Sequence, residues 1–188
     1  FQLFFQQGII GRAVTKQQID VSVFNIRDFA TDKHRVTDDR PYGGGSGMVM
    51  KPEPLAGAIR SAKSISPDSK TVLLTPQGRT FDQAAARSYA DCEGLILVCG
   101  RYEGIDERID HRFVDDEVSI GDYVLMGGEL AAMVIMESVA RLIPGVLGAE
   151  DSAEKDTFSG NFVEHAHYTR PYVFEGDAVP DILLSGNH

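Results

Sequence analysis

The chain has 188 residues, of which 43% are hydrophobic and 24% charged, and this composition predicts one globular domain with a buried core. No apolar run approaches the roughly 20 residues that a membrane-spanning helix needs, so the sequence predicts no membrane partner. The formal net charge of −10 argues against a nucleic-acid partner if total charge is the only guide. Residues 1–90 nevertheless carry more Lys and Arg than Asp and Glu, which leaves room for a local basic patch.

The first third of the chain alternates between regular and loop-like patterns. Helical periodicity covers residues 1–17, and the alternating pattern of residues 19–26 predicts a strand. Residues 27–50 are polar and then glycine-rich, which is typical of a long loop. Apolar residues at helical spacing over residues 55–62 predict a helix with one buried face.

The middle of the chain predicts two buried strands with a helix between them. Residues 71–75 form a short apolar run that we expect to end at Pro76. A capping box opened by Thr80 predicts a helix that continues to about Tyr89. The continuous apolar run of residues 94–100 predicts the second strand.

A third strand and a last helix are expected in the stretch SIGDYVLMGGELAAM. The pattern predicts a strand within residues 119–125 and a helix over residues 129–143. Residues 145–160 are acidic with few apolar anchors, which is typical of a flexible linker, and residues 161–188 show no clear element. Continuous apolar strands separated by helices predict an α/β fold, with a mostly parallel sheet covered by helices on both faces.

Each predicted strand is followed by a loop that contains glycine. Ligands collect at the carboxyl ends of strands in open α/β sheets, and glycine lets a ligand approach the backbone closely. One such loop is explained equally well by a tight strand-to-helix turn, but three at equivalent ends favour a pocket lined by backbone groups. Such a pocket could recognise the edge of an adenine ring.

Common nucleotide, metal and thiol motifs are incomplete. The GGGSGM segment at 43–48 lacks the Lys-Ser/Thr of a phosphate-binding loop, and no dinucleotide fingerprint follows a strand. His165 and His167 alone are weak evidence for a metal. Cys92 and Cys99 are too few for a disulfide framework and favour a reduced, cytoplasmic protein.

Two charged residues have simple structural explanations. Arg141 follows Glu137 by four residues, so the two could form an ordinary ion pair on a helix. Asp156 lies in the acidic linker, where a solvated charge is the usual role.

Seven segments in one order carry a family resemblance: DDRPYGGGSGM, TPQGR, LILVCGRYEGIDER, SIGDYVLMGGELAAM, RLIPGVLG, HYTRP and LLSGNH. Together they resemble the bacterial tRNA (guanine-N1)-methyltransferases of the TrmD family, from end to end of the chain. The resemblance implies the α/β fold with a deep trefoil knot that is typical of SPOUT methyltransferases. True knots are rare, and the residue patterns alone do not predict one.

The resemblance also implies the following organisation. Residues 1–145 would form the catalytic domain, residues 146–165 a flexible linker, and residues 166–188 the start of a domain that binds tRNA. Family members carry a strand ahead of the position of Phe1, and a small basic domain continues beyond that of His188. The protein would be an obligate homodimer with its active site at the interface.

The implied reaction is methylation of N1 of the guanosine immediately 3′ of the anticodon, which supports maintenance of the reading frame. The methyl donor would be S-adenosylmethionine. Magnesium is a further implied cofactor, but no metal site can be assigned. Two alternatives stay open: a nucleotide hydrolase that uses the glycine-rich loop as a phosphate nest, and a non-catalytic RNA-binding module.

The resemblance assigns roles by position. The cofactor would contact Leu74, Thr75, Pro76, Gln77, Gly100, Tyr102, Glu103, Ile120, Gly121, Asp122, Tyr123, Val124, Leu125, Gly127 and Gly128. The tRNA would contact Arg40, Tyr42, Gly43, Gly44 and Gly45. Asp156 would be the general base, and Arg141 would stabilise the charge that develops on O6 of the guanine.

Overall fold

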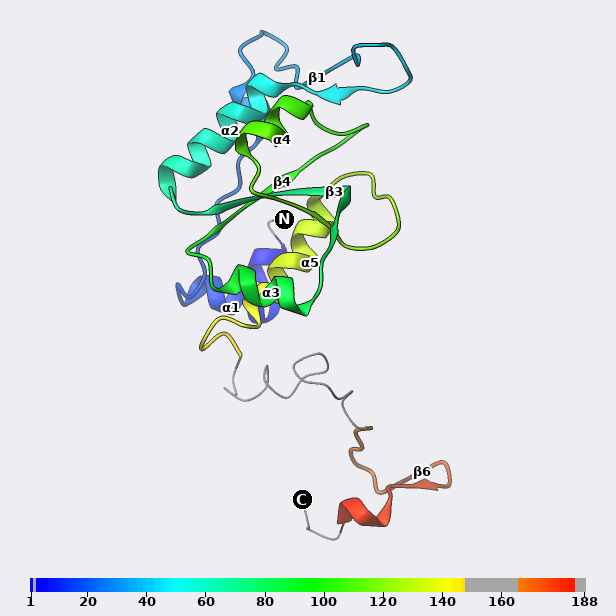
Figure 1. Cartoon of the computed structure of the whole chain (residues 1–188). Helices are drawn as coiled ribbons and strands as arrows, with labels where there is room; N and C mark the ends of the chain where they lie inside the picture. Colours follow the sequence, from blue (N-terminus) through cyan, green and yellow to red (C-terminus); the bar gives the residue numbers. More distant parts are fainter. Residues whose placement is uncertain (2, 148–165, 185–188) are drawn as a thin grey trace. The chain divides into compact units, whose positions relative to one another are not determined.

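The computed structural model describes residue 1, residues 3–147 and residues 166–184 (Figure 1). The chain divides into two compact units, Phe1–Ala153 and Glu154–His188, which we describe separately. Among the described residues, no helix is long and apolar enough to cross a membrane.

A three-stranded parallel sheet lies at the centre of the first unit. Its order is β4-β3-β5, with β3 at Lys70–Thr80, β4 at Leu95–Cys99 and β5 at Asp116–Ser119. The central strand aligns Leu74 with Cys99 on one side and with Val118 on the other. The expected class, an α/β fold with a parallel sheet flanked by helices, is therefore confirmed, while the knot stays a prediction.

Five α-helices accompany this sheet. They are α1 (Gly8–Thr15), α2 (Pro52–Ile65), α3 (Gln83–Ala90), α4 (Glu107–Phe113) and α5 (Glu129–Ala140). Short 3-10 helices form at η1 (Phe4–Gln6) and η2 (Ile26–Phe29), and a small hairpin pairs β1 (Asp38–Asp39) with β2 (Val49–Met50).

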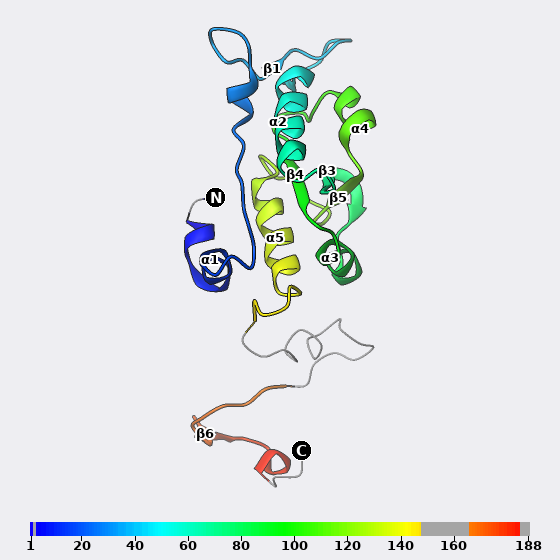
Figure 2. The ribbon, with the colours of Figure 1, turned by 90° about the vertical axis from the view of Figure 1, so that its left-hand side faces the viewer.

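The helices cover both faces of the sheet, with α3 and α5 on one face and α2 and α4 on the other (Figures 1 and 2). Successive residues of a strand point to opposite faces, and β3 follows this rule. Val72 and Leu74 pack in the cluster that contains Ile135 of α5. Leu73 packs in the other cluster with Leu55 of α2. Because both faces are buried, β4 and the Val72–Leu74 part of β3 are continuous apolar runs.

The structure corrects the predictions for the amino-terminal region. The expected helix over residues 1–17 is divided, since Gln7 is extended and Gly8 has a φ of 64°. The strand expected at residues 19–26 is absent: residues 19–25 form neither helix nor strand, and η2 begins at Ile26. Apolar and polar residues alternate along this segment, but no strand among the described residues pairs with it.

Two strand boundaries and one cap were also wrong. Strand β3 continues past Pro76 to Thr80, with a shift of register between Leu74 and Arg79. The third strand was predicted within residues 119–125, but β5 spans Asp116–Ser119 and overlaps that range only at Ser119. The side chain that caps α3 is that of Asp82 rather than Thr80. The Asp82 carboxylate accepts a hydrogen bond from the amide of Ala85 at 2.8 Å.

The described part of the second unit is small. Strands β6 (Val173–Phe174) and β7 (Asp177–Ala178) form a hairpin, and η3 spans Asp181–Leu184. The predicted linker at 146–165 lies almost entirely outside the described residues. The predicted domain boundaries therefore remain expectations.

Candidate functional site

The carboxyl ends of the three parallel strands meet at one edge of the sheet. Leu74 lies between Cys99 and Val118 in the hydrogen-bonded register. The chain passes from β3 to β4 through α3 on one face, and from β4 to β5 through α4 on the other face. The helices that follow the neighbouring strands β3 and β4 thus lie on opposite faces, and such a switch point is the usual place for a ligand in an open α/β sheet.

Two of the predicted binding loops contact each other directly. The amide of Gly128 donates a hydrogen bond to the carbonyl of Gly100 at 3.0 Å, and the backbones of Arg101 and Gly127 form an isolated antiparallel β-bridge. The Arg101 guanidinium also binds the Glu129 carboxylate, with Nε 2.8 Å from Oε1. The structure therefore joins the loop after β4 to the first turn of α5.

The glycines of the SIGDYVLMGG segment have reasons internal to the fold. A Cβ on Gly128 would lie 2.8 Å from the Cα of Cys99, so only glycine lets α5 begin against the end of β4. Gly121 has a φ of 145°, and a Cβ there would lie 2.6 Å from the Tyr123 ring. These contacts give Gly121 and Gly128 a role within the fold, while their contact with a cofactor stays a prediction.

The loop itself still offers groups that suit a polar heterocycle. In the part of the chain that the structure describes, the amides of Val124 and Leu125 form no hydrogen bond. Tyr123, Val124 and Met126 are exposed, while Ile120 and Leu125 pack against the core. Free backbone donors beside an aromatic ring are the chemistry that adenosine recognition requires, so these residues fit the implied cofactor.

The loop Thr75–Gly78 is pinched at its base. Leu74 and Arg79 both align with Val118 of β5, so the four residues between them are pushed out of the sheet. A Cβ on Gly78 would overlap the backbone of Glu117 and Val118, so the loop returns to the sheet through a close backbone contact. Pro76 is tolerated because an extruded residue has no need to donate a ladder hydrogen bond.

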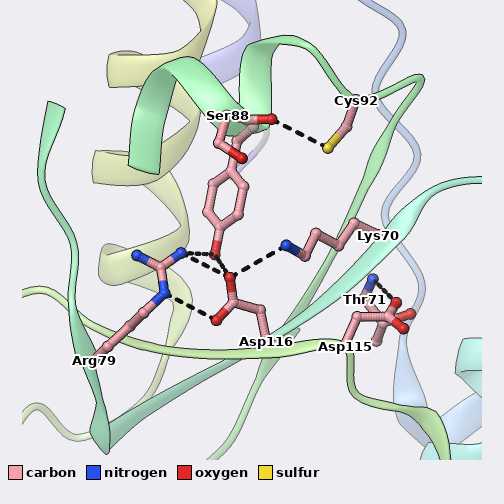
Figure 3. A network of polar contacts seen from close by, with 8 residues as sticks. Lys70, Thr71, Arg79, Ser88, Cys92, Asp115 and Asp116 are labelled. Carbon is pink, nitrogen blue, oxygen red and sulfur yellow. Dashed lines mark hydrogen bonds and ion pairs between the residues drawn. The ribbon is translucent and has the colours of Figure 1, made fainter. Parts of the chain in front are cut away.

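A network of charged side chains lies beside this loop (Figure 3). Arg79 binds the Asp116 carboxylate with two nitrogens, at 3.1 Å from Nε to Oδ1 and 2.7 Å from Nη2 to Oδ2. The Tyr89 hydroxyl donates to Oδ2 at 2.8 Å, and Lys70 Nζ lies 3.5 Å from the same oxygen. Asp116 thus connects β5 to both ends of β3 and to α3.

The pKa values reflect these contacts. The hydrogen bonds from Arg79 are the main reason why the pKa of Asp116 falls to about 2. Burial, followed by the hydrogen bond to Asp116, raises the pKa of Tyr89 well above its usual value. Burial, followed by the nearby charge of Glu129, raises the pKa of Cys99 to about 12, so this thiol is not an activated nucleophile.

The glycine-rich loop predicted to contact tRNA is attached to the loop after β4. The amide of Glu103 donates to the carbonyl of Met48 at 3.0 Å, and a Cβ on Gly47 would collide with the Glu103 side chain. Tyr42 is fully exposed, and Gly43, Gly44 and Gly45 all have positive φ. The structure thus brings this loop next to one predicted cofactor residue.

Of the two predicted catalytic residues, the structure describes Arg141, which lies away from the strand ends. Asp156 lies outside the described residues. Arg141 follows the last residue of α5, whereas Gly128 precedes its first. At 1.5 Å per residue, the two ends of this helix are roughly 20 Å apart.

A group of possible metal ligands on α4 was not predicted from the sequence. Glu107, Asp110 and His111 each place one ligand atom within 4.8 Å of the others, and this is the one such group in the described residues. The group is largely exposed, and exposed carboxylates commonly gather without an ion. The sequence analysis also missed the Arg79–Asp116 pair, whose only local signal is an arginine directly after Gly78.

Comparison with known proteins decides the family. A profile described as "tRNA (Guanine-1)-methyltransferase TrmD" matches residues 1–188. The chain belongs to this family. Proteins described as tRNA (guanine-N(1)-)-methyltransferase are 57% identical over 188 residues in Desulfatibacillum aliphaticivorans and 59% identical over 182 residues in Geobacter sulfurreducens. A third, from Dehalococcoides mccartyi, is 52% identical over 189 residues.

These matches cover nearly all of the chain and about three quarters of each relative. The aligned part is 100%, 97% and 100% of this chain, and 72%, 74% and 76% of the three relatives in the same order. The family resemblance inferred from the seven sequence segments is confirmed.

Proposed function

We propose that the protein transfers a methyl group from S-adenosylmethionine to N1 of a guanosine in tRNA, at the position immediately 3′ of the anticodon. The observation that carries this proposal is the match of the whole chain to the tRNA (guanine-1)-methyltransferase family. The neighbouring strand-end loops, with free amides at Val124 and Leu125, support a cofactor site in the same place.

The cofactor supplies an activated methyl group, bound to a sulfonium, when it is present. The residues of this chain that would hold it are those of the three strand-end loops assigned above. Leu74 pairs with Cys99, the last residue of β4 before Gly100, and the turn at Gly127 and Gly128 is bonded to the loop after β4. One continuous surface of backbone groups is therefore available to it.

Asp156 is the proposed general base. Its carboxylate would accept the N1 proton of the guanine, which makes that nitrogen a better nucleophile for the methyl group. Arg141 would stabilise the negative charge that the loss of the proton leaves on O6. The proton thus moves to the protein, and the methyl group takes its place on N1.

The position of Arg141 supports a homodimer with a shared active site. Within one chain, Arg141 and the strand-end loops lie at opposite ends of α5. If Arg141 acts on O6 of a guanine bound beside these loops, it would come from the partner chain. Leu130 and Val134 lie one turn apart on α5 and are exposed, as is Met126 just before the helix. This apolar surface is suited to a second copy of the chain.

The glycine-rich loop is the proposed tRNA contact. Arg40 can bind phosphate, and the exposed Tyr42 ring can stack on a base. The loop is bonded to Glu103 through Met48, so the two substrates would bind side by side. A phosphate-hydrolysing role for this loop is not favoured, because it has no lysine followed by serine or threonine.

Calorimetry with S-adenosylmethionine and methyl transfer to a tRNA transcript test the proposal together. We expect binding of the cofactor and methylation of the guanosine 3′ of the anticodon. Asp156→Asn is expected to keep cofactor affinity within about twofold and to lower kcat by 10²-fold or more, in line with the usual contribution of a general base. Unchanged turnover would remove Asp156 from the mechanism.

Mixed dimers test the shared site. Arg141→Ala and a variant of the cofactor loops, such as Gly121→Val, should each be inactive alone. If the site is shared, co-expression should restore about a quarter to a half of the activity, because one of the two sites in a mixed dimer contains no substitution. Full loss of activity in the mixture would instead place Arg141 and the cofactor loop of one chain in the same site.

A further inference from the structure

The loop Thr75–Gly78 is a bulge within β3, and its four residues pair with neither β4 nor β5. It leaves the sheet after Leu74 and returns at Arg79, and both of these residues align with Val118. Pro76 and Gln77 at its tip are exposed. Whether the loop stays in this conformation therefore depends on what keeps its two ends together.

The first end is held by ordinary packing. Leu74 is buried in the hydrophobic cluster of α3 and α5, and it is hydrogen-bonded within the sheet between β4 and β5. A residue with this environment is fixed by the core. The second end has less support, because Arg79 and Thr80 are exposed and pair with β5 alone, at Val118 and Ser119.

The second end is held by a carboxylate. Asp116 has a side chain that is only 14% exposed, and both of its oxygens accept hydrogen bonds from Arg79. The bidentate geometry fixes the direction of the arginine side chain as well as its distance. Tyr89 and Lys70 hold the carboxylate from α3 and from the start of β3 (Figure 3).

The two ends of the loop are therefore kept together across β5. The backbone of Gly78 rests against Glu117 and Val118, which lie immediately after Asp116. If the arginine side chain were released, this backbone contact and the pairing of Arg79 and Thr80 with β5 would be the remaining restraints on the returning segment. The base of the loop would then be held less firmly than in the wild type.

We propose that Arg79 and Asp116 are positioning residues that close the base of the Thr75–Gly78 loop and hold its backbone ready for S-adenosylmethionine. This inference rests on the proposed function, since it assigns the loop to the cofactor. Neither residue touches the reacting atoms. Their effect is on cofactor affinity, with the affinity for tRNA and the chemical step left in place.

Hydrogen exchange of the cofactor-free protein tests the closure by itself. Asp116→Asn keeps the shape of the side chain and removes its charge, and Arg79→Lys keeps the charge and removes the two-nitrogen geometry. In both variants we expect the amides of a peptide that covers residues 75–80 to exchange at least about tenfold faster, while a peptide that covers Leu95–Cys99 is unchanged. Equal exchange of residues 75–80 in the variants and the wild type would overturn the closure.

Cofactor affinity and steady-state kinetics test the consequence. For both variants we expect the Kd for S-adenosylmethionine to rise about tenfold, which corresponds to about 1.4 kcal/mol. The KM for tRNA, and kcat at saturating cofactor, should stay within about twofold of the wild type. A fall in kcat with an unchanged cofactor Kd would contradict a positioning role.

A core variant separates positioning from stability. Val139→Ala removes a buried side chain near the end of α5 that lies away from the strand ends, and it should lower the unfolding free energy without changing the cofactor Kd. An equal rise in Kd for Val139→Ala would attribute the effect to stability and overturn the proposal. If wild-type protein binds no cofactor, the proposed function fails. Hydrogen exchange still tests whether Arg79 and Asp116 close the base of the loop.

Discussion

Two loops at the same edge of the sheet are held in place by different physical means. The returning end of the Thr75–Gly78 loop is fixed by a charged pair, in which Asp116 accepts two hydrogen bonds from Arg79. The loop of residues 120–127 ends in a steric contact, where the backbone of Gly128 lies against Cys99. The charged pair of the first loop holds only while the Asp116 carboxylate is ionised, and the second loop is held because Gly128 has no side chain.

This difference predicts how each loop responds to its surroundings. A charged pair weakens when acid protonates the carboxylate or when salt screens it. A close approach between two backbones is insensitive to both, but it tolerates no added atoms. The following predictions separate the two behaviours, beginning with the largest effect.

Gly128→Val should have the largest effect on stability. Its Cβ would lie 2.8 Å from the Cα of Cys99, and backbone atoms can move little to make room. We expect the unfolding free energy in urea to fall by about 3 kcal/mol. Gly100→Ala is the matched control, because its nearest neighbour would be a methyl carbon of Ile105 at 3.5 Å, and it should cost less than about 1 kcal/mol. Similar losses in both variants would contradict the steric explanation.

Acid should weaken the charged pair and leave the steric contact unchanged. The pKa of Asp116 is lowered to about 2 from its ordinary value of 3.8, so its stabilisation is present above pH 4 and is lost as the pH falls toward 2. The stabilisation amounts to at most about 2 kcal/mol.

The measurement is the unfolding free energy of wild type and Asp116→Asn as a function of pH. The difference between the two should shrink as the pH falls below 4, whereas the cost of Gly128→Val should be the same at pH 4 and pH 7. A difference between wild type and Asp116→Asn that does not vary with pH would show that the pair contributes no charge-dependent stability.

The Arg101–Glu129 pair should contribute less than the Arg79–Asp116 pair. The Arg101 side chain is 56% exposed, and ion pairs in contact with water are typically worth less than about 1 kcal/mol. Arg101→Gln should therefore change the unfolding free energy by about 0.5 kcal/mol, and 0.5 M salt should remove most of that change. A loss as large as that of Asp116→Asn would mean that exposure does not distinguish the two pairs.

The smallest expected effect concerns the reactivity of Cys99. Its pKa is raised to about 12, first by burial and then by the charge of Glu129, so iodoacetamide should modify it very slowly at pH 8. Glu129→Gln removes the second cause and should accelerate the reaction by a fewfold. Quantitative mass spectrometry of the peptide that contains Cys99 provides the rate, and no acceleration would remove Glu129 as a cause.

Much of the sheet could be predicted from the sequence because its elements are defined locally. Strand β4 is a continuous apolar run, and α5 begins at the predicted residue. Strand β5 was misplaced because its first residues are acidic. Asp116 can occupy a half-buried strand only because Arg79, Tyr89 and Lys70 surround its carboxylate.

The network beside the candidate site could not be predicted from local patterns. Arg79 and Asp116 are separated by 37 residues, and nothing near either residue indicates the other. The family resemblance identified the loops but not what holds them. The strand expected at residues 19–26 failed for a related reason: alternation indicates a half-buried segment, but it does not supply a neighbouring strand.

The pinched loop also has a consequence for the order of folding. Its local sequence contains no contact that closes it, since both ends pair with Val118 and the second also binds Asp116. Contacts of such sequence separation form late because the intervening chain must first be ordered. During synthesis, residues 75–78 can acquire their final shape only after β5 has left the ribosome. A chain interrupted before that point would contain the residues of this loop without its conformation.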